Sequence, residues 1–362
     1  MNRIEIVKRI DSLVGRAISL PAKRLYRPRA RAGEGLNSFL IIRPGGIGDA
    51  VLLIPVIAKL KKRYPNAVID VLAEKRNGAV FALCPDVSNL YRYDAPREFI
   101  SALRNSYDVV IDTEQWHRLS AVAARLTRAP MSIGFATNER KELFTHAIPY
   151  SHDDYEVNSF LHLVEPCGVV AGFDLQVPFL SIGAELQDRA TRLLHGLSGR
   201  RMVAIFPGGS IRERKWGNSR FHQTAKRLSD DGCGIVVVGG RDDRDEGREI
   251  IAGLPDAVNL CGTLSLPETA AVLAQTELLI SGDSGIMHIG YGLGIKIIGL
   301  FGPGREKKWA PQSSRVAILN KHLACSPCTS FGYTPRCPIN AACMKEITVD
   351  EVVAKAGELL NP

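Results

Sequence analysis

Residues 280–288, with the sequence Ile-Ser-Gly-Asp-Ser-Gly-Ile-Met-His, place a carboxylate, hydroxyls and an imidazole directly after a short apolar run. That run is short enough for a buried strand, and Gly282 then ends it. The residues that follow predict a short helix, whose free amides attract anions at the carboxyl edge of a parallel sheet. The groups expected at the mouth of such a ligand site are Asp283, Ser284, the backbone of Gly285, and His288.

A second turn of this kind lies at residues 40–49, Leu-Ile-Ile-Arg-Pro-Gly-Gly-Ile-Gly-Asp. Here an apolar strand runs into a glycine turn, in which Gly46 and Gly48 let a ligand approach the backbone and are expected to bind the donor. The segment matches a dinucleotide fingerprint only in part, because the third glycine position is Val51, and this weighs against a nicotinamide enzyme. Asp49 follows the turn, where a carboxylate either caps the helix or accepts a proton from a nucleophilic hydroxyl.

Cations gather in a third segment, residues 207–217, Pro-Gly-Gly-Ser-Ile-Arg-Glu-Arg-Lys-Trp-Gly, which again follows an apolar run. It offers backbone amides, the Ser210 hydroxyl and the cationic side chains of Arg212, Arg214 and Lys215. A diphosphate leaving group needs such partners, because negative charge grows on it as its bond to a sugar breaks. If these cations suffice, no divalent metal is required. The alternative is a solvated basic loop.

Acidic residues follow the next glycine pair, in the segment Gly239-Gly-Arg-Asp-Asp-Arg-Asp-Glu246. One of these acids, for which we take Glu246, is expected to bind the hydroxyls of a ribose. Stabilisation of a helix start is the commoner role of acids at such positions, and it stays open as the alternative.

These polar segments lie between apolar runs that alternate with helical patterns along the chain. Strands are expected at residues 39–43, 68–73, 89–93, 109–112, 202–206, 234–238, 257–260, 278–281 and 296–301. Such alternation implies an α/β protein with parallel sheets that carry helices on both faces. The pattern loosens around residues 175–183, so two doubly wound domains are expected at residues 36–182 and 183–345, followed by a helix within 346–362.

The composition, with 362 residues of which 45% are apolar and 23% charged, is that of a folded protein of two domains. No apolar run is long enough to cross a bilayer, and no secretory signal is evident. The net charge of +8 is concentrated in residues 1–35, which carry nine Lys/Arg and three Asp/Glu. Apolar residues recur there at helical spacing, which predicts either an amphipathic helix on an anionic membrane or a solvated or domain-packed helix. Nucleic acid is not an expected partner, because aromatic residues are not interleaved with the basic ones.

Four of the eight cysteines, Cys325, Cys328, Cys337 and Cys343, form the pattern C-x2-C-x8-C-x5-C in a Pro-rich stretch after the last expected strand. Four thiolates can hold one zinc or iron ion in a tetrahedron and so clip a loop with little apolar content. Two disulfides or four free thiols are the alternatives, and a reducing cytoplasm disfavours the disulfides. The cluster is expected to be structural rather than catalytic.

Over most of residues 38–350, the order of these segments resembles the ADP-heptose:lipopolysaccharide heptosyltransferase family, glycosyltransferase family 9. The resemblance is carried by Gly48-Asp49 followed by Pro55, by Phe206-Pro-Gly-Gly-Ser with Lys215-Trp216, by residues 282–288 and by Phe301-Gly-Pro-Gly304. It implies a GT-B fold, in which two Rossmann-like doubly wound domains face each other across a cleft that holds the active site. It also implies Asp49 as general base, Lys215 as a donor-phosphate ligand and residues 283–288 as the donor-binding turn. For His288, a buried core position stays open as the alternative.

The function implied by this resemblance is an inverting transfer of heptose from ADP-heptose to a lipid-linked acceptor, the lipopolysaccharide core or a related glycan. No cofactor is then required for the chemistry. Alternatives are the same fold acting on another sugar or another acceptor, such as a protein, and a non-catalytic nucleotide-sugar-binding module. The presence of both Asp49 and Lys215 favours an enzyme. It is expected in the cytoplasm, where the basic N-terminal extension would bring it to the inner face of the membrane.

Overall fold

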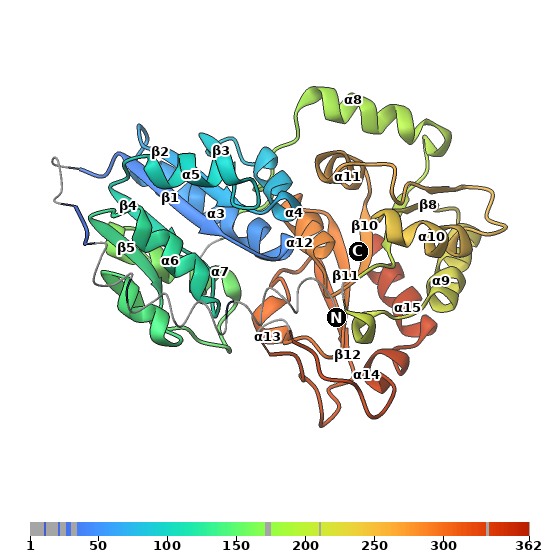
Figure 1. Cartoon of the computed structure of the whole chain (residues 1–362). Helices are drawn as coiled ribbons and strands as arrows, with labels where there is room; N and C mark the ends of the chain where they lie inside the picture. The colour runs from blue at the N-terminus through green and yellow to red at the C-terminus, as the bar shows by residue number, and fades with distance from the viewer. Residues whose placement is uncertain are drawn as a thin grey trace. The chain divides into compact units, whose positions relative to one another are not determined.

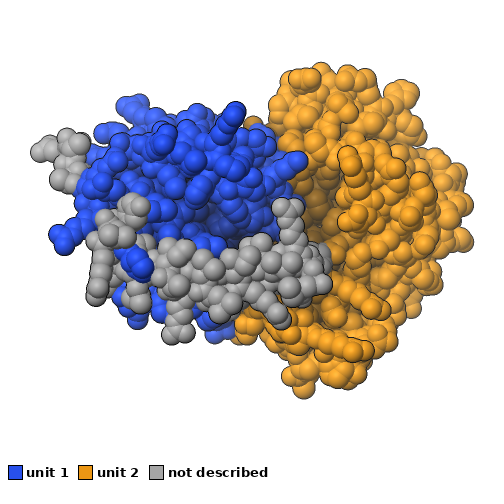
Figure 2. Space-filling view, in the orientation of Figure 1, with its two compact units in different colours: residues 1–175 blue, residues 176–362 orange. Residues whose placement is uncertain are grey.

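The computed structural model describes residues 11, 21, 27–29, 35–170, 175–209, 211–330 and 333–361. The chain divides into two compact units, residues 1–175 and 176–362, which Figure 2 colours blue and orange. The division falls shortly before the boundary expected at residue 182. Most of the expected N-terminal extension, residues 1–35, lies outside the described residues.

The sheet of unit 1 has six parallel strands in the order β3-β2-β1-β4-β5-β6. These strands are β1 (Ser38–Arg43), β2 (Val68–Ala73), β3 (Asn89–Arg92), β4 (Val109–Asp112), β5 (Met131–Phe135) and β6 (His146–Ile148). The central strands β1 and β4 are buried along almost their whole length, which is why each is a continuous apolar run in the sequence. They pair with each other, and Ile42 lies opposite Asp112 at the carboxyl end of the pair.

Helices cover both faces of this sheet (Figure 1). They are α3 (Ile47–Arg63), α4 (Lys75–Gly78), α5 (Pro96–Arg104), α6 (Arg118–Leu126) and α7 (Glu156–Val164), with short 3₁₀ helices at Ala79–Leu83, Glu139–Leu143 and Glu165–Cys167. Leu40 of β1 shares one apolar core with Ala102 of α5 and Ala121 of α6. On the other face α3 packs against α7, whose Phe160 lies beside Phe135 of β5.

The sheet of unit 2 also has six parallel strands, in the order β12-β11-β10-β7-β8-β9. They are β7 (Met202–Phe206), β8 (Gly234–Val237), β9 (Ala257–Asn259), β10 (Leu278–Gly282), β11 (Lys296–Phe301) and β12 (Val316–Asn320). β7 and β10 pair at the centre, with Ser281 opposite Phe206. Both are buried apolar runs, as expected of strands covered on two faces.

The helices of unit 2 again lie on both faces of its sheet (Figure 1). They are α8 (Ala184–Leu193), α9 (Asn218–Asp230), α10 (Arg244–Ile250), α11 (Leu266–Leu273), α12 (Gly285–Gly292), α13 (Glu306–Trp309), α14 (Ala342–Lys345) and α15 (Val349–Leu360), with 3₁₀ helices at His195–Leu197, Arg212–Arg214 and Arg241–Asp243. Val352 and Ala356 of α15 belong to the same apolar core as Ile280 of β10. The C-terminal helix is therefore an integral part of unit 2.

In both sheets the order of strands reverses at the centre. In unit 1 the chain adds β2 and β3 on one side of β1 and then continues with β4 on the other; in unit 2 the same reversal lies between β7 and β10. Doubly wound sheets bind ligands outside the carboxyl ends of their strands at such a switch point. The segments that follow β1, β7 and β10 are three of the four in which the sequence predicts site residues.

The predicted fold class is confirmed, because each unit is a parallel six-stranded α/β sheet. Every expected strand is present to within one residue at each end, whereas β5, β6 and β12 were not predicted. Among the helices that the structure describes, none is both long and apolar enough to cross a membrane.

Candidate active site

Asp49 lies in the first turn of α3, directly after the carboxyl end of β1. Gly45 has a φ of +101°, a conformation that other L-residues rarely adopt, and it turns the chain out of the strand. Gly46 is the residue that caps the helix, with no side-chain hydrogen bond to it, and Gly48 lies in the first turn. A Cβ atom on Gly46 would lie 2.4 Å from Asp49 Oδ2. The glycine turn therefore makes room for the carboxylate, and Asp49 is not the cap itself.

The Asp49 carboxylate is held through one of its two oxygens. Gln115 Nε2 donates a hydrogen bond of 3.1 Å to Asp49 Oδ1, and Arg43 Nη1 lies 3.6 Å from the same oxygen. The Asp49 side chain keeps 18% of its surface exposed, whereas that of Arg43 keeps 2%. Asp49 is thus a partly exposed carboxylate that rests on buried polar groups.

Arg43, the last residue of β1, joins the carboxyl ends of β1 and β4. Its Nη1 donates to the Thr113 carbonyl at 2.8 Å and its Nη2 to Glu114 Oε2 at 3.3 Å. Burial lowers the pKa of Arg43, because it disfavours the charged form. The nearby carboxylates, Asp49 and Glu114 first among them, outweigh this effect and raise the pKa above the ordinary value. For Glu114 burial works against the charge in the same way, yet Arg43 and His117 hold its pKa below 4.5.

A second buried ion pair, between Arg140 and Asp112, lies next to the first. Neither side chain is exposed, and Arg140 also donates to the Glu114 carbonyl. Burial raises the pKa of Asp112 above its usual range, although Arg140 acts in the opposite direction. At the switch point of this sheet, two buried ion pairs, Arg43 with Glu114 and Arg140 with Asp112, therefore lie next to each other, and Arg43 also contacts Asp49.

Gln115 and Glu156 were not predicted as site residues. Both are buried, and Gln115 Nε2 also donates to Glu156 Oε1 at 2.6 Å. The sequence did contain a signal for Gln115. A polar run begins at Asp112, the last residue of the buried strand β4, and includes Gln115, just as Asp49 comes after the end of β1. Glu156 has no such signal, since it begins α7 well away from any strand end.

In unit 2 two of the cations predicted to bind phosphate, Arg214 and Lys215, each contact a carboxylate. Arg214 Nη1 lies 2.8 Å from Asp283 Oδ2, and the two side chains are 18% and 7% exposed. Lys215 Nζ donates to Glu246 Oε1 at 2.7 Å. Arg214 and Lys215 end the loop after β7, while Asp283 follows β10, so the structure gathers these predicted residues at the switch point of the sheet.

Close packing of the neighbouring turns fixes the Asp283 side chain. A Cβ on Gly304, in the turn after β11, would lie 2.1 Å from Asp283 Oδ2. Ser284 is the N-cap of α12; its hydroxyl accepts from the Met287 amide at 3.3 Å and lies 2.9 Å from Ser281 Oγ. The first turn of α12, beginning at Gly285, thus starts beside Asp283 with its amides at the carboxyl edge of the sheet.

The remaining predicted residues have different surroundings. His288 is 2% exposed and its ring lies edge-on to Trp309 at 6.4 Å. Ser210 lies outside the described residues. Trp216 packs in the core, where its Nε1 donates to the Ile347 carbonyl at 2.9 Å.

The four-cysteine segment packs on the turn after β11. A Cβ on Gly302 would lie 2.9 Å from Cys343 Sγ, and the Cys328 amide donates to the Pro303 carbonyl at 3.1 Å. Burial first, and then the charges of Cys325 and Cys337, raise the pKa of Cys328. No disulfide joins these four cysteines.

Thiolates suit zinc and iron as ligands. Among the described residues, no three or more His, Cys, Asp or Glu side chains are placed to hold a metal ion. The predicted metal clip therefore stays a prediction and has no part in the chemistry below.

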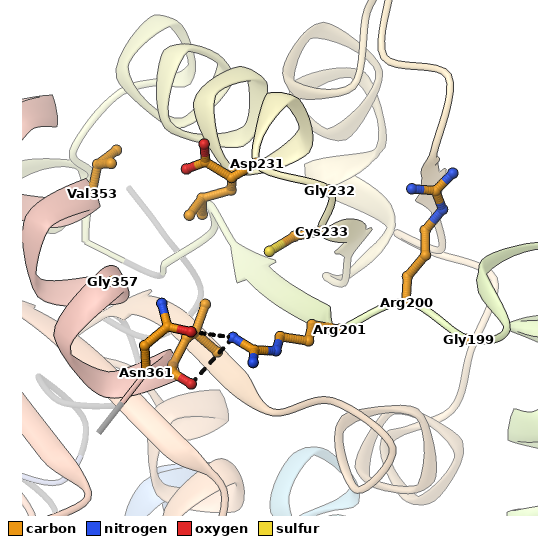
Figure 3. A pocket seen from close by; sticks show the side chains of 11 residues that line it. Gly199, Arg200, Arg201, Asp231, Gly232, Cys233, Val353, Gly357 and Asn361 are labelled. Atoms are coloured by element: carbon orange, nitrogen blue, oxygen red, sulfur yellow. Dashed lines mark hydrogen bonds between the residues drawn. The ribbon is translucent and has the colours of Figure 1, made fainter.

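A surface hollow of unit 2, drawn in Figure 3, lies at the amino ends of β7 and β8. There Arg201 Nη1 donates to Asn361 Oδ1 at 2.6 Å and to the Leu360 carbonyl at 3.3 Å. Because parallel sheets bind ligands at the carboxyl ends of their strands, this hollow is at the wrong edge for the residues described above.

Comparison with known proteins places the chain among glycosyltransferases. The model of the family described as glycosyltransferase family 9 (heptosyltransferase) matches residues 97–334. The chain is 28% identical over 291 residues to lipopolysaccharide heptosyltransferase 3 of Escherichia coli, an alignment that covers 74% of this chain and 84% of the relative.

Solved structures share the fold of the whole chain. The structure of E. coli ADP-heptose LPS heptosyltransferase II superposes with a TM-score of 0.73 at 22% identity, covering 89% of this chain and 98% of the other. E. coli heptosyltransferase WaaC with ADP gives a TM-score of 0.66 at 18% identity, covering 89% and 97%. These likenesses show the GT-B fold.

Proposed function

Because the chain belongs to glycosyltransferase family 9, the heptosyltransferase family, we propose that it transfers heptose from ADP-heptose to the lipopolysaccharide core or a related glycan, with inversion at the sugar. Its relative in E. coli is named a lipopolysaccharide heptosyltransferase, and WaaC, which has the same fold, was solved with ADP. The observation that carries the proposal is the chemistry at the two switch points. One has a partly exposed carboxylate, Asp49, and the other has the cations Arg214 and Lys215.

In the proposed reaction Asp49 is the general base. The acceptor hydroxyl attacks the anomeric carbon of the heptose from the side opposite ADP, and its proton passes to the Asp49 carboxylate. The bond between that carbon and the β-phosphate oxygen breaks as the new glycosidic bond forms. ADP leaves with the electron pair of the broken bond.

Arg214 and Lys215, with the first amides of α12, are proposed to stabilise the charge that develops on the departing diphosphate. Arg214 contacts Asp283, and Lys215 contacts Glu246. The diphosphate therefore either displaces these carboxylates from the two cations or binds the cations together with them. Glu246 is proposed to bind the ribose hydroxyls. Two cations and a helix start supply the positive charge that a divalent metal supplies in other enzymes, so the proposal requires none.

The test of this function is release of ADP and formation of glycosylated acceptor from ADP-heptose and a lipopolysaccharide core. Asp49→Ala should bind ADP-heptose as well as the wild type and lose most transfer, about 10²- to 10⁴-fold, because general-base catalysis contributes that much. A matched control is Asp350→Ala, since Asp350 is exposed on the surface of α15 and pairs with Arg227. Full transfer by Asp49→Ala would reject the assignment of the base.

The donor is identified separately by a thermal-shift panel of ADP-, UDP- and GDP-sugars. A ligand that binds only the native state raises its melting temperature by mass action. ADP-heptose should give the largest shift. A larger shift with a UDP- or GDP-sugar would change the donor while leaving the transferase proposal intact, and binding without any transfer would identify a binding module.

We also propose that the enzyme works at the inner face of the cytoplasmic membrane, where the basic residues of segment 1–35 contact anionic lipid. Flotation with vesicles that contain anionic lipid, using the full chain and a chain that lacks residues 1–35, tests this. The full chain should float with the vesicles and the shortened chain should not; equal recovery would exclude the proposal.

A further inference from the structure

Gln115 connects two carboxylates through a single amide nitrogen. Its Nε2 donates to Asp49 Oδ1 at 3.1 Å and to Glu156 Oε1 at 2.6 Å. An amide nitrogen carries two hydrogens, so these two bonds use both of them. Because carboxylates accept and do not donate, only the nitrogen side of the amide can face both partners, and this fixes the orientation of the Gln115 side chain.

Glu156 anchors the far end of this connection. Its side chain is completely buried at the first position of α7, and its second oxygen, Oε2, accepts from the Tyr150 hydroxyl at 3.1 Å. Gln115 is itself 8% exposed. The link therefore runs from the buried start of a helix to the partly exposed Asp49, and it leaves Gln115 little freedom to move.

The two oxygens of Asp49 consequently have different surroundings. Oδ1 accepts from Gln115 and lies near Arg43. Oδ2 accepts no hydrogen bond within the described part of the chain, and it points over Gly46, where a Cβ would be 2.4 Å away. One oxygen is fixed by the protein, and the other is left for a ligand.

We propose that Gln115 is a positioning residue for transfer: it holds Asp49 Oδ1 so that Oδ2 meets the acceptor hydroxyl and takes its proton. This inference rests on the proposed function, in which Asp49 is the base. Loss of the amide would let the carboxylate rotate, and a misplacement of about 1 Å at a reacting group costs on the order of 100-fold in rate. The loss should appear in kcat, since the proposed mechanism gives Gln115 no part in binding the donor.

Gln115→Met removes both donated hydrogen bonds and keeps nearly the same volume. It should lower kcat about 10- to 100-fold and leave the KM for ADP-heptose within about twofold. Because a loss of folded protein would also lower the apparent kcat without changing KM, kcat is expressed per binding-competent molecule, counted by titration with ADP. The matched control is Gln275→Met. Gln275 Nε2 also donates two hydrogen bonds, to the Gln187 carbonyl at 3.1 Å and to Thr191 Oγ1 at 2.8 Å, at the surface of unit 2. That control should keep wild-type kcat.

A double-mutant cycle with Asp49→Ala separates positioning of the base from any other role of Gln115. If Gln115 acts through Asp49, adding Gln115→Met to Asp49→Ala should change the residual rate by less than about twofold. An equal loss in both backgrounds, or wild-type kcat for Gln115→Met, would overturn the inference and leave Asp49 as the base. Full activity of Asp49→Ala alone would instead overturn the base assignment, and the inference with it.

Thermal unfolding of each variant accompanies the kinetics. If Gln115→Met does not fold, Gln115→Asn takes its place in the cycle, because its shorter amide fits the same space and cannot reach both carboxylates. The same outcomes then decide: a loss of kcat that disappears in the Asp49→Ala background supports the inference, and a loss that persists there overturns it.

Discussion

Arg214 and Asp283 form an ion pair of 2.8 Å that joins the loop after β7 to the turn after β10, across the switch point of the unit 2 sheet. Both side chains are largely buried, so water screens the pair less than it screens a surface ion pair. In the proposed reaction a diphosphate enters this place with negative charge. Asp283 therefore competes with the ligand for Arg214, and the affinity for ADP reflects that competition.

Replacing Asp283 by Asn removes the competing charge and keeps the shape of the side chain. ADP should bind more tightly to Asp283→Asn, by about fivefold, which corresponds to an ion-pair contribution of about 1 kcal/mol. Isothermal titration with ADP at low and high salt measures this, and the gain should shrink at high salt. Asp350→Asn, on the exposed surface of α15, should leave the affinity unchanged. Weaker binding of ADP by Asp283→Asn would contradict the competition.

Lys215→Met should weaken donor binding and turnover together. Lys215 Nζ is the cation that Glu246 holds at 2.7 Å, and loss of a hydrogen bond from a charged group costs about 1.5–3 kcal/mol, or about 10- to 100-fold in affinity. Binding of ADP-heptose and single-turnover transfer provide the two measurements. Lys226→Met is the control, because Lys226 is exposed on α9 and pairs only loosely with Asp230, at 3.8 Å. Unchanged donor affinity in Lys215→Met would remove Lys215 from the donor site.

Two glycines should respond in opposite ways to the same substitution. A Cβ on Gly304 would lie 2.1 Å from Asp283 Oδ2, whereas a Cβ on Gly357, inside α15, would meet nothing within 4 Å. Gly304→Ala should destabilise the protein by about 1–3 kcal/mol, because Asp283 must move. Gly357→Ala should stabilise it by about 1 kcal/mol, the helix preference of alanine over glycine. Urea unfolding compares the two, and equal stabilities would contradict the packing of Gly304 on Asp283.

The stability of the protein should depend on pH through Glu114. Its pKa is held below the usual 4.5 in the folded state, where Arg43 and His117 outweigh the effect of burial. A carboxylate with a lowered pKa stabilises the fold above its unfolded pKa, and this contribution is lost as the pH falls through the folded pKa. Glu114→Gln should therefore be less stable than the wild type at pH 7, by about 3 kcal/mol, and the difference should narrow below about pH 4.5.

Urea unfolding at pH 7, 5 and 4 measures the Glu114 effect. Glu358→Gln is the control, since Glu358 lies on the surface of α15, and its effect should be small at every pH. A stability difference for Glu114→Gln that stays constant from pH 7 to pH 4 would show that the carboxylate is not linked to folding in this way.

The cysteine segment should hold about one zinc or iron ion per chain if its thiolates form the predicted clip. Protein purified without added metal, analysed by mass spectrometry of its elements, tests this. Cys325→Ser and Cys328→Ser should then lose the metal, while Cys84→Ser, a change at a buried thiol of unit 1, should keep it. Metal-free protein with four thiols that react freely would exclude the clip.

The central strands could be predicted from sequence because they are continuous apolar runs that end in glycine turns. Those features depend on local sequence alone, and the structure has these strands within one residue of their expected ends. β6 escaped prediction because it has three residues, two of them exposed, and thus lacks the apolar signal of a buried strand. β12, at the other sheet's edge, is only half-buried along its length.

The site residues, like the strands, could be predicted only where the signal is local in the sequence. Asp49 and Asp283 each follow a glycine turn after a buried strand, so local pattern identifies them. Gln115 is 66 residues from Asp49 in sequence and 41 from Glu156, and these three meet only because β1 pairs with β4 and α7 lies beside α3. That meeting is a property of sheet order and helix packing, which a single sequence does not display.

The division of the chain near residue 175 has an evolutionary consequence. The proposed base lies before that point, and the cations and helix start proposed to bind the diphosphate lie after it, each half with an apolar core of its own. Recombination there between two members of the family would exchange the half proposed to meet the glycan and keep the half proposed to select the nucleotide. New linkages could arise in this way from an unchanged donor supply, and chimaeras joined at this point should inherit their nucleotide preference from the C-terminal parent.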